Sequence, residues 1–118
     1  MKIWIKLMTA LGFPPVAGVV LAALITSKTP LNLTELSRRT GYAKSHLSQT
    51  LKLMHARNVV ESYVEKKKKY YVLNMKGLLK ELEQHIDNIL DSLHHLSNST
   101  NEIEFAEFYE KLSRKFKV

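Results

Sequence analysis

The segment at residues 43–57 carries the side chains best suited to polar recognition. If the segment is helical, Leu47, Leu51 and Met54 share one face, because they are spaced four and three residues apart. The opposite face and its flanks then present hydroxyl, amide, imidazole and ammonium groups: Lys44, Ser45, His46, Ser48, Gln49 and Lys52. Such groups bind a polar or anionic partner through hydrogen bonds and positive charge.

The net charge also indicates an anionic partner. The chain has 118 residues, with 18 Lys and Arg against 11 Asp and Glu, and a formal net charge of +7. Residues 28–76 hold 11 of the basic residues but only 3 of the acidic ones, a net +8, whereas the rest of the chain is −1. A surplus of this kind favours nucleic acid, an acidic protein or a membrane surface. Its concentration in one segment argues against a general solubility or membrane-surface charge.

Few other side chains are arranged for chemistry. The chain has no cysteine, which excludes disulfides, thiolate metal sites and cysteine catalysis. No acid pair, nucleophile–base set or glycine-rich phosphate loop occurs at a recognisable spacing. An enzyme is therefore the least favoured interpretation, and no cofactor is expected.

A group of histidines and aspartates in the carboxyl-terminal part raises the question of a metal ion: His85, Asp87, Asp91, His94 and His95. On one helix, Asp87, Asp91 and His94 point away from the apolar seam described below, and His85 flanks that seam. The side chains do not converge, so we interpret them as solvated polar residues and predict no metal site.

Two helices are expected around residues 33–57. Asn32 and Glu35 have the spacing of a capping box, which predicts a short helix over 33–40 that ends at Gly41. A second helix follows over about 43–57. Asn58 comes next, a residue that tolerates the left-handed backbone of a helix-ending turn.

A hairpin is expected after these helices. Residues 59–64 and 70–73 are rich in β-branched and aromatic side chains, and the acidic and basic run 65–69 separates them. The sequence therefore predicts a hairpin with a cationic tip of four lysines. The turn type stays open, since the turn has no Gly, Asn or Asp.

The order of short helix, turn, longer helix and basic hairpin resembles the winged helix-turn-helix superfamily, in the region of the MarR-, ArsR- and TrmB-like regulators. The resemblance covers 31–73 and is carried by Ser37, Gly41 four residues later and Leu47 six after that. Matching residue types also occur at Leu36, Leu51, Met54, 58–61 and 71–73. The sequence departs from the pattern at Ala43, where a Ser or Thr cap is common, and in the wing, where lysines replace arginines.

The resemblance implies that the longer helix enters the major groove of double-stranded DNA while the shorter one braces it against the backbone. It places Ser45, Gln49 and Lys52 toward base edges, with Lys44, His46 and Ser48 beside them. The residues that suit phosphates are Arg38, Arg39, Lys66, Lys67, Lys68 and Lys69. Two alternatives remain open: a solvated helix face, and a lysine tip that serves only solubility.

The amino-terminal part predicts two helices rather than a membrane span or a signal peptide. Residues 7–26 are almost uncharged, but Pro14 and Pro15 interrupt them at the centre. We expect one helix over about 2–11 and a second, buried one that starts with proline and ends near Ser27. No membrane partner is expected.

The carboxyl-terminal part predicts a long helix over about 75–97, a break at 97–101 and a last helix over about 102–116. Apolar residues alternate three and four apart along the long helix, as in the seam of a coiled coil. By the same resemblance, these helices and the first one form a dimer. The predicted interface residues are Ile3, Leu7, Leu79, Leu82, Ile86, Ile89, Leu93, Leu96, Phe105, Tyr109 and Leu112.

The whole chain, 1–118, is expected to be one winged-helix domain, mainly α with a small β-hairpin wing. Residues 1–27 form its amino-terminal helices, 28–74 the helix-turn-helix and wing, and 75–118 the dimerisation helices. The favoured function is a cytoplasmic, homodimeric, sequence-specific DNA-binding transcriptional regulator. A sequence-tolerant architectural DNA-binding protein and a winged-helix protein-interaction module are the alternatives. The operator, any small-molecule effector and the direction of regulation are not readable from the sequence.

Overall fold

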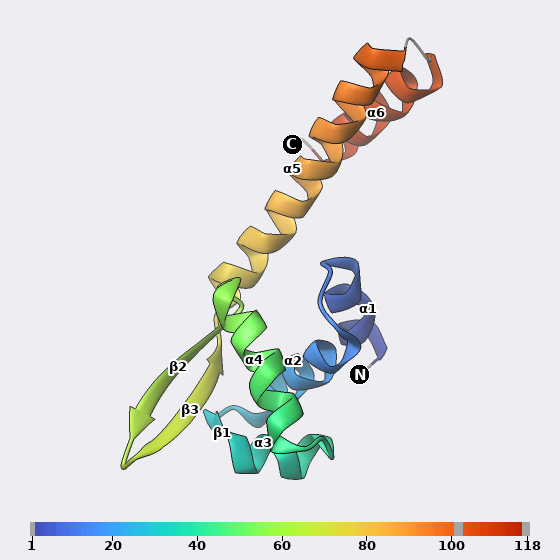
Figure 1. Ribbon diagram of the computed structural model, residues 1–118. Coiled ribbons are helices and arrows are strands. Elements are labelled where there is room, and N and C mark those ends of the chain that lie inside the picture. Colours follow the sequence, from blue (N-terminus) through green and yellow to red (C-terminus); the bar gives the residue numbers. More distant parts are fainter. Residues whose placement is uncertain (1, 101–102, 117–118) are drawn as a thin grey trace. The chain divides into compact units, whose positions relative to one another are not determined.

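The computed structural model describes residues 2–100 and 103–116, which divide into two compact units, 1–81 and 82–118. The elements, in chain order, are α1 (Lys2–Ala10), α2 (Pro15–Ser27), β1 (Leu31–Asn32), α3 (Leu33–Thr40), α4 (Lys44–Ala56), β2 (Val60–Glu65), β3 (Lys68–Leu73), α5 (Met75–Thr100) and α6 (Ile103–Phe116) (Figure 1). The chain is mainly helical, as predicted.

The uncharged amino-terminal stretch forms two helices, as the sequence indicates. Gly12, with φ 92°, and the prolines separate them, and Pro15 occupies the start of α2, where a missing N–H costs nothing. α2 is buried on nearly all sides and is the centre of the core. A Cβ atom on Gly18 would lie 2.4 Å from Cα of Ile5, so α1 packs directly on the α2 backbone. Among the described helices, none is long and apolar enough to cross a membrane.

The predicted capping box begins α3. The N–H of Glu35 donates to Oδ1 of Asn32 at 2.8 Å, and the N–H of Asn32 donates to Oε1 of Glu35 at 3.0 Å. Gly41 ends the helix with φ 81°. α4 then buries Leu47, Leu51 and Met54, the face that the spacing predicts. Asn58 follows with φ 63°, which is the left-handed turn expected there.

The wing is a three-stranded antiparallel sheet in the order β1-β3-β2. Strand β1 is not predicted from the sequence, because two residues are too few to show a β pattern. It pairs Leu31 with Tyr71 and Asn32 with Tyr70. Figure 1 shows the β2–β3 hairpin extending to one side of α3 and α4.

The predicted tip of the wing is wrong in length. Pairing continues to Glu65 opposite Lys68, so Lys68 and Lys69 belong to β3 and only Lys66 and Lys67 form the turn. Both turn residues have positive φ, 50° and 65°. Positive φ at both central positions is the mark of a type I′ turn, whose twist matches that of the flanking strands. The turn type could not be predicted from the sequence, because lysine rarely adopts positive φ.

The residues that follow α4 form hydrogen bonds and an ion pair with the residues at the start of α5. The N–H of Asn74 donates to the carbonyl of Val59 at 2.8 Å, and Oδ1 of Asn74 accepts from the N–H of Gly77 at 3.0 Å. A Cβ on Gly77 would overlap the carbonyl oxygen of Asn58, so only glycine fits at this crossing. Arg57 adds an ion pair to Glu81 at 2.7 Å.

In the second unit, α6 lies alongside the end of α5 (Figure 1). The rings of His94 and Tyr109 are 4.8 Å apart. The break predicted at 97–100 is wrong, since α5 continues to Thr100, while residue 101 lies outside the described residues. Ser97 Oγ donates back to the carbonyl of His94 at 2.8 Å, and such bonds let polar side chains remain inside a helix.

Candidate nucleic-acid interface

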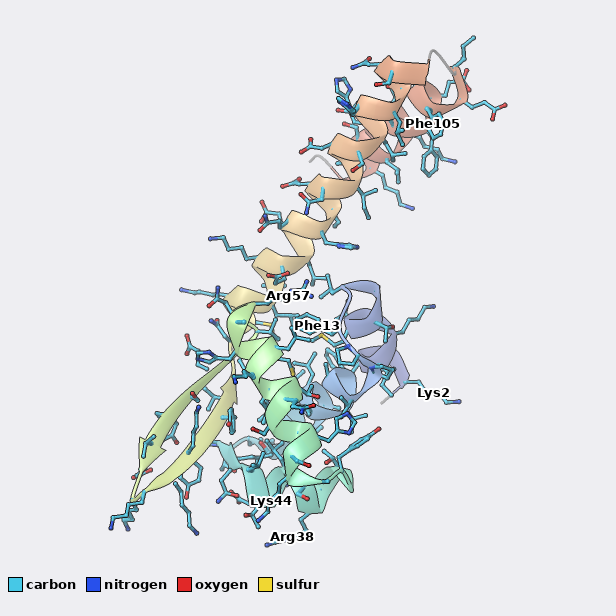
Figure 2. All side chains as sticks on the ribbon, viewed as in Figure 1. Lys2, Phe13, Arg38, Lys44, Arg57 and Phe105 are labelled. Atoms are coloured by element: carbon cyan, nitrogen blue, oxygen red, sulfur yellow. The ribbon has the colours of Figure 1, made fainter. Side chains whose placement is uncertain are left out.

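The residues predicted to contact DNA are all exposed, and they lie on three neighbouring elements of the first unit. Arg38 and Arg39 are on α3, six residues from Lys44 to Lys52 are on α4, and four lysines are on the wing. Figure 2 shows Arg38 and Lys44 at the same end of this unit, where α3 turns into α4. The fold therefore brings the predicted residues to the surface without burying any of them.

Two sets of contacts fix the orientation of α4: its buried side chains pack in the core, and side chains near its first turn contact the preceding turn. Leu47 and Met54 are fully buried, and Thr50 donates through Oγ1 to the carbonyl of His46 at 3.2 Å. Before the helix, Ser37 Oγ donates to the carbonyl of Tyr42 at 2.7 Å. The ring of Tyr42 meets that of His46 edge-on, with 5.3 Å between the centroids. The polar face of α4 is thus presented by a turn held through side-chain contacts.

The wing presents positive charge on both faces of its sheet. Tyr71 is buried, so Lys69, two residues earlier on β3, lies on the same face, and Lys68 lies on the other. The ammonium of Lys69 is 5.7 Å from the centroid of the Tyr71 ring. On the outer face, Tyr63 and Tyr70 stack with centroids 5.7 Å apart. The stacked rings stiffen the hairpin that carries the lysines.

A groove of about 350 Å³ lies between α4 and β3. It brings together four residues predicted to contact DNA with two that were not predicted, His55 and Tyr71; the four are Ser48, Gln49, Lys52 and Lys69. His55 was detectable, because Ser48, Lys52 and His55 follow the four-and-three spacing of one helix face. Tyr71 was not, because only the sheet register brings it to α4.

The positive charge of these residues is not compensated by carboxylates. Within residues 2–100 and 103–116, the two ion pairs are Arg57 with Glu81 and Arg114 with Glu110. Neither includes a residue predicted to contact DNA. The exposed cations on α3, α4 and the wing are therefore available to an anionic partner.

The comparison with protein families identifies the helix-turn-helix. Residues 16–62 match the family model of the IclR helix-turn-helix domain, a stretch that runs from α2 into β2. YvaV of Bacillus subtilis strain 168, which carries the name of an HTH-type transcriptional regulator, is 39% identical over 59 residues. The HTH-type transcriptional repressor OpcR of the same organism is 36% identical over 59 residues.

Those matches cover 50% of this chain but only 33% and 32% of the relatives, so the chain spans about a third of their length. Both relatives are named as regulators of transcription and neither as an enzyme, in agreement with the sequence-based expectation.

Solved structures share the fold at low sequence identity. The crystal structure of a transcriptional regulator has a TM-score of 0.62 at 13% identity and covers 92% of this chain and 82% of its own. A MarR-family regulator from Silicibacter pomeroyi has a TM-score of 0.55 at 22% identity; the match covers 98% of this chain and 80% of that regulator. A point mutant of MepR from S. aureus, bound to an oligodeoxyribonucleotide, has a TM-score of 0.57 at 15% identity. The match covers 97% of this chain and 85% of the MepR chain.

The chain has the winged helix-turn-helix fold, and residues 16–62 resemble the helix-turn-helix domain of the IclR family. In the terms of this fold, α3 and α4 are the helix-turn-helix, α4 has the position of the recognition helix and the β1-β3-β2 sheet is the wing. The predicted winged helix-turn-helix is confirmed, although the matching family model is that of IclR, which was not among the families expected from the sequence.

The residues predicted for a dimer interface lie outside the helix-turn-helix and wing, on α1, α5 and α6. None of them is buried. Ile3, Leu79 and Ile89 are 72%, 56% and 43% exposed. The half-buried members are Leu7, Leu82, Ile86, Leu93, Phe105, Tyr109 and Leu112, and Leu96 is 42% exposed. Both units of this winged-helix chain thus carry apolar side chains at the surface.

The histidines and aspartates of α5 do not form a metal centre within the described part of the chain, where no three His, Asp or Glu side chains are grouped around one point. His94 instead contacts Tyr109 on α6 and Asn98 one turn later at 3.3 Å.

Proposed function

We propose that this winged-helix chain is a sequence-specific regulator of transcription that binds double-stranded DNA as a homodimer. The observation that carries the proposal is the exposed, uncompensated polar and cationic surface shared by α3, α4 and the wing. Two similarities support it. The relative OpcR is named as a transcriptional repressor, and MepR, which shares the fold, was solved with an oligodeoxyribonucleotide.

In this proposal, α4 lies in the major groove and reads base edges. Gln49 has an amide that can bond the N6 and N7 positions of adenine, and Lys52 can bond the acceptors of guanine. Both side chains are exposed on the face opposite the buried Leu47 and Leu51. Ser45 lies one helical turn before Gln49, so three consecutive turns of the helix carry a polar side chain on this face.

The remaining cations bind the phosphate backbone. Arg38 and Arg39 lie in the last turn of α3, and the wing lysines extend the positive surface along the hairpin. Phosphate contacts set the affinity and the register on the duplex, whereas base contacts set sequence preference.

The homodimer is supported by the exposed apolar side chains of α1, α5 and α6. Exposed Ile3, Leu79 and Ile89 are costly in water, and a two-fold partner would cover them. A two-fold dimer also presents two recognition helices to half-sites about one DNA turn apart.

A titration of the chain against genomic fragments, with competitor DNA at a stated salt concentration, tests the proposal. Selective retention of some fragments supports a sequence-specific regulator. Equal affinity for all fragments would instead identify an architectural DNA-binding protein. Absence of binding would leave a protein-interaction module. Light scattering at the same concentrations measures the oligomeric state.

A further inference from the structure

Arg57, the residue that ends α4, contacts other parts of the first unit rather than the surface proposed to bind DNA. Its guanidinium lies over the ring of the buried Phe13 and forms the ion pair with Glu81. A Cβ atom on Gly12 would be 3.8 Å from Nη1 of Arg57, so the guanidinium also lies against the turn between α1 and α2. Figure 2 shows Arg57 and Phe13 near one end of α4 and Lys44 at the other end. The charge of Arg57 is therefore engaged by the protein itself.

The two segments that Arg57 contacts also carry residues of the proposed dimer interface. Ile3 lies on α1, which ends just before the turn that Arg57 contacts, and Leu79 lies two residues before Glu81 on α5. Both are exposed apolar side chains of the first unit. The side chain of Arg57 thus links the end of α4 to both segments of this unit that would meet a second copy of the chain.

The two residues after Arg57 limit how far α4 and α5 can separate, and the guanidinium adds a direction. The carbonyl of Val59 accepts from the N–H of Asn74, and the carbonyl of Asn58 lies directly against Gly77. Meanwhile the guanidinium carbon lies over the Phe13 ring, and Nε and Nη2 both donate to one carboxylate oxygen. A planar guanidinium can make both contacts at once, whereas the single ammonium of a lysine cannot.

We infer that Arg57 is a positioning residue, which sets the placement of α4 relative to the dimer interface and thereby selects the spacing of the half-sites in DNA. The inference rests on the proposed function, since only a dimer that binds two half-sites can prefer a spacing. Two-fold symmetry makes the spacing sensitive to this residue. The same small rotation of α4 occurs in both protomers, so it changes the separation of the two helices without changing the side chains that face the bases.

The experiment measures the affinity of the full chain for duplexes that carry two selected half-sites at the natural spacing, or at a spacing changed by one or two base pairs. Wild-type affinity should fall at least about tenfold when the spacing changes, because the DNA must then be twisted to fit. In Arg57→Lys and Glu81→Gln the fall should be less than about threefold. Affinity for a duplex with one half-site should stay within about twofold of wild type, because neither residue is among the predicted DNA contacts.

The matched controls are Arg114→Lys and Glu110→Gln, which make the same changes in the exposed ion pair of α6. Both should keep the wild-type dependence of affinity on spacing. A purely structural role for Arg57 predicts a different outcome, namely equal weakening on every duplex, with the spacing preference unchanged.

That outcome would overturn the inference and leave the dimeric function intact. A wild-type chain that binds all spacings equally would overturn the inference and the dimeric function together. Thermal unfolding shows whether each variant is folded. Glu81→Gln provides the test if Arg57→Lys does not fold, because it leaves the contact between Arg57 and Phe13 in place.

Discussion

The guanidinium of Arg57 lies 4.0 Å from the centroid of the Phe13 ring (Figure 2), and its Nη2 and Nε atoms donate to Oε2 of Glu81 at 2.7 and 3.2 Å. Arg57 directly follows α4, Phe13 lies between α1 and α2, and Glu81 is on the early turns of α5. One side chain thus joins the end of the recognition helix to two other segments of the first unit.

Arg57→Ala should therefore destabilise the first unit by about 1–2 kcal/mol, because it removes a cation–π contact and a partly buried ion pair together. The free energy of unfolding in urea measures the effect. Arg114→Ala is the control. The side chains of Arg114 and Glu110 are 81% and 70% exposed, so the free energy of unfolding should change by less than about 0.5 kcal/mol. Equal losses of stability in the two variants would contradict the role given to Arg57.

The wing turn should become more stable when its residues suit positive φ. The double variant Lys66→Asn with Lys67→Gly should raise the free energy of unfolding by about 1–2 kcal/mol, since both residues adopt the left-handed conformation at little cost. The same variant should lower DNA affinity, because it removes two positive charges. Glutamine at both positions removes the same charges without improving the turn, so it should weaken DNA binding but add no stability.

Gln49→Ala should change which sequences the chain prefers. Loss of a bidentate contact to adenine should reduce discrimination between a selected duplex and its single-base variant roughly tenfold, with a smaller effect on unrelated duplexes. Gln84→Ala changes the other glutamine, which is exposed on α5. A Gln49 variant that kept the wild-type preference, as the Gln84 variant should, would remove Gln49 from the base contacts.

Replacing the four wing lysines, 66–69, by glutamine should weaken all duplexes by a similar factor. It should also flatten the dependence of log K on log salt, by about 0.9 for each phosphate that is no longer neutralised. The matched control changes four exposed lysines outside residues 28–76: Lys2, Lys6, Lys80 and Lys111. If both quadruple variants gave the same affinity and slope, the wing would act only through net charge.

A charge placed in the predicted dimer interface should separate the protomers. Ile89→Glu or Leu79→Glu should give a monomer by light scattering and weaken binding to DNA with two half-sites. Val64→Glu alters an apolar side chain that is 70% exposed on the wing, outside the predicted interface, and should leave the oligomeric state unchanged. A wild-type monomer at DNA-binding concentrations would rule out the dimer.

The helix-turn-helix could be predicted from the sequence almost to the residue, because its determinants are local. Asn32 and Glu35 define the start of α3 through their own side chains, and Gly41 defines its end through its backbone. The buried face of α4 follows from helical spacing alone. None of these features depends on a distant part of the chain.

The wing and the groove between α4 and β3 were harder to predict, because they depend on how strands distant in the sequence pair with one another. Strand β1 exists only because Leu31 meets Tyr71, and the turn at Lys66 and Lys67 is set by the register of β2 and β3 rather than by turn-forming residues. The same register brings Tyr71 to the groove that Lys52 also lines. Leu31 and Lys52 lie far from Tyr71 along the chain, and no periodicity within one segment reveals that they meet it in space.

The alternation of Lys68 and Lys69 across β3 has a mechanical consequence for the hairpin. Because neighbouring lysines lie on opposite faces and Lys66 and Lys67 form the narrow end, the hairpin is cationic all the way around. Its attraction to a polyanion therefore depends little on how far it is rotated about its long axis. In the proposed complex with DNA, the wing would therefore follow a duplex whose grooves widen or narrow with sequence, while α4 would keep a fixed angle of approach.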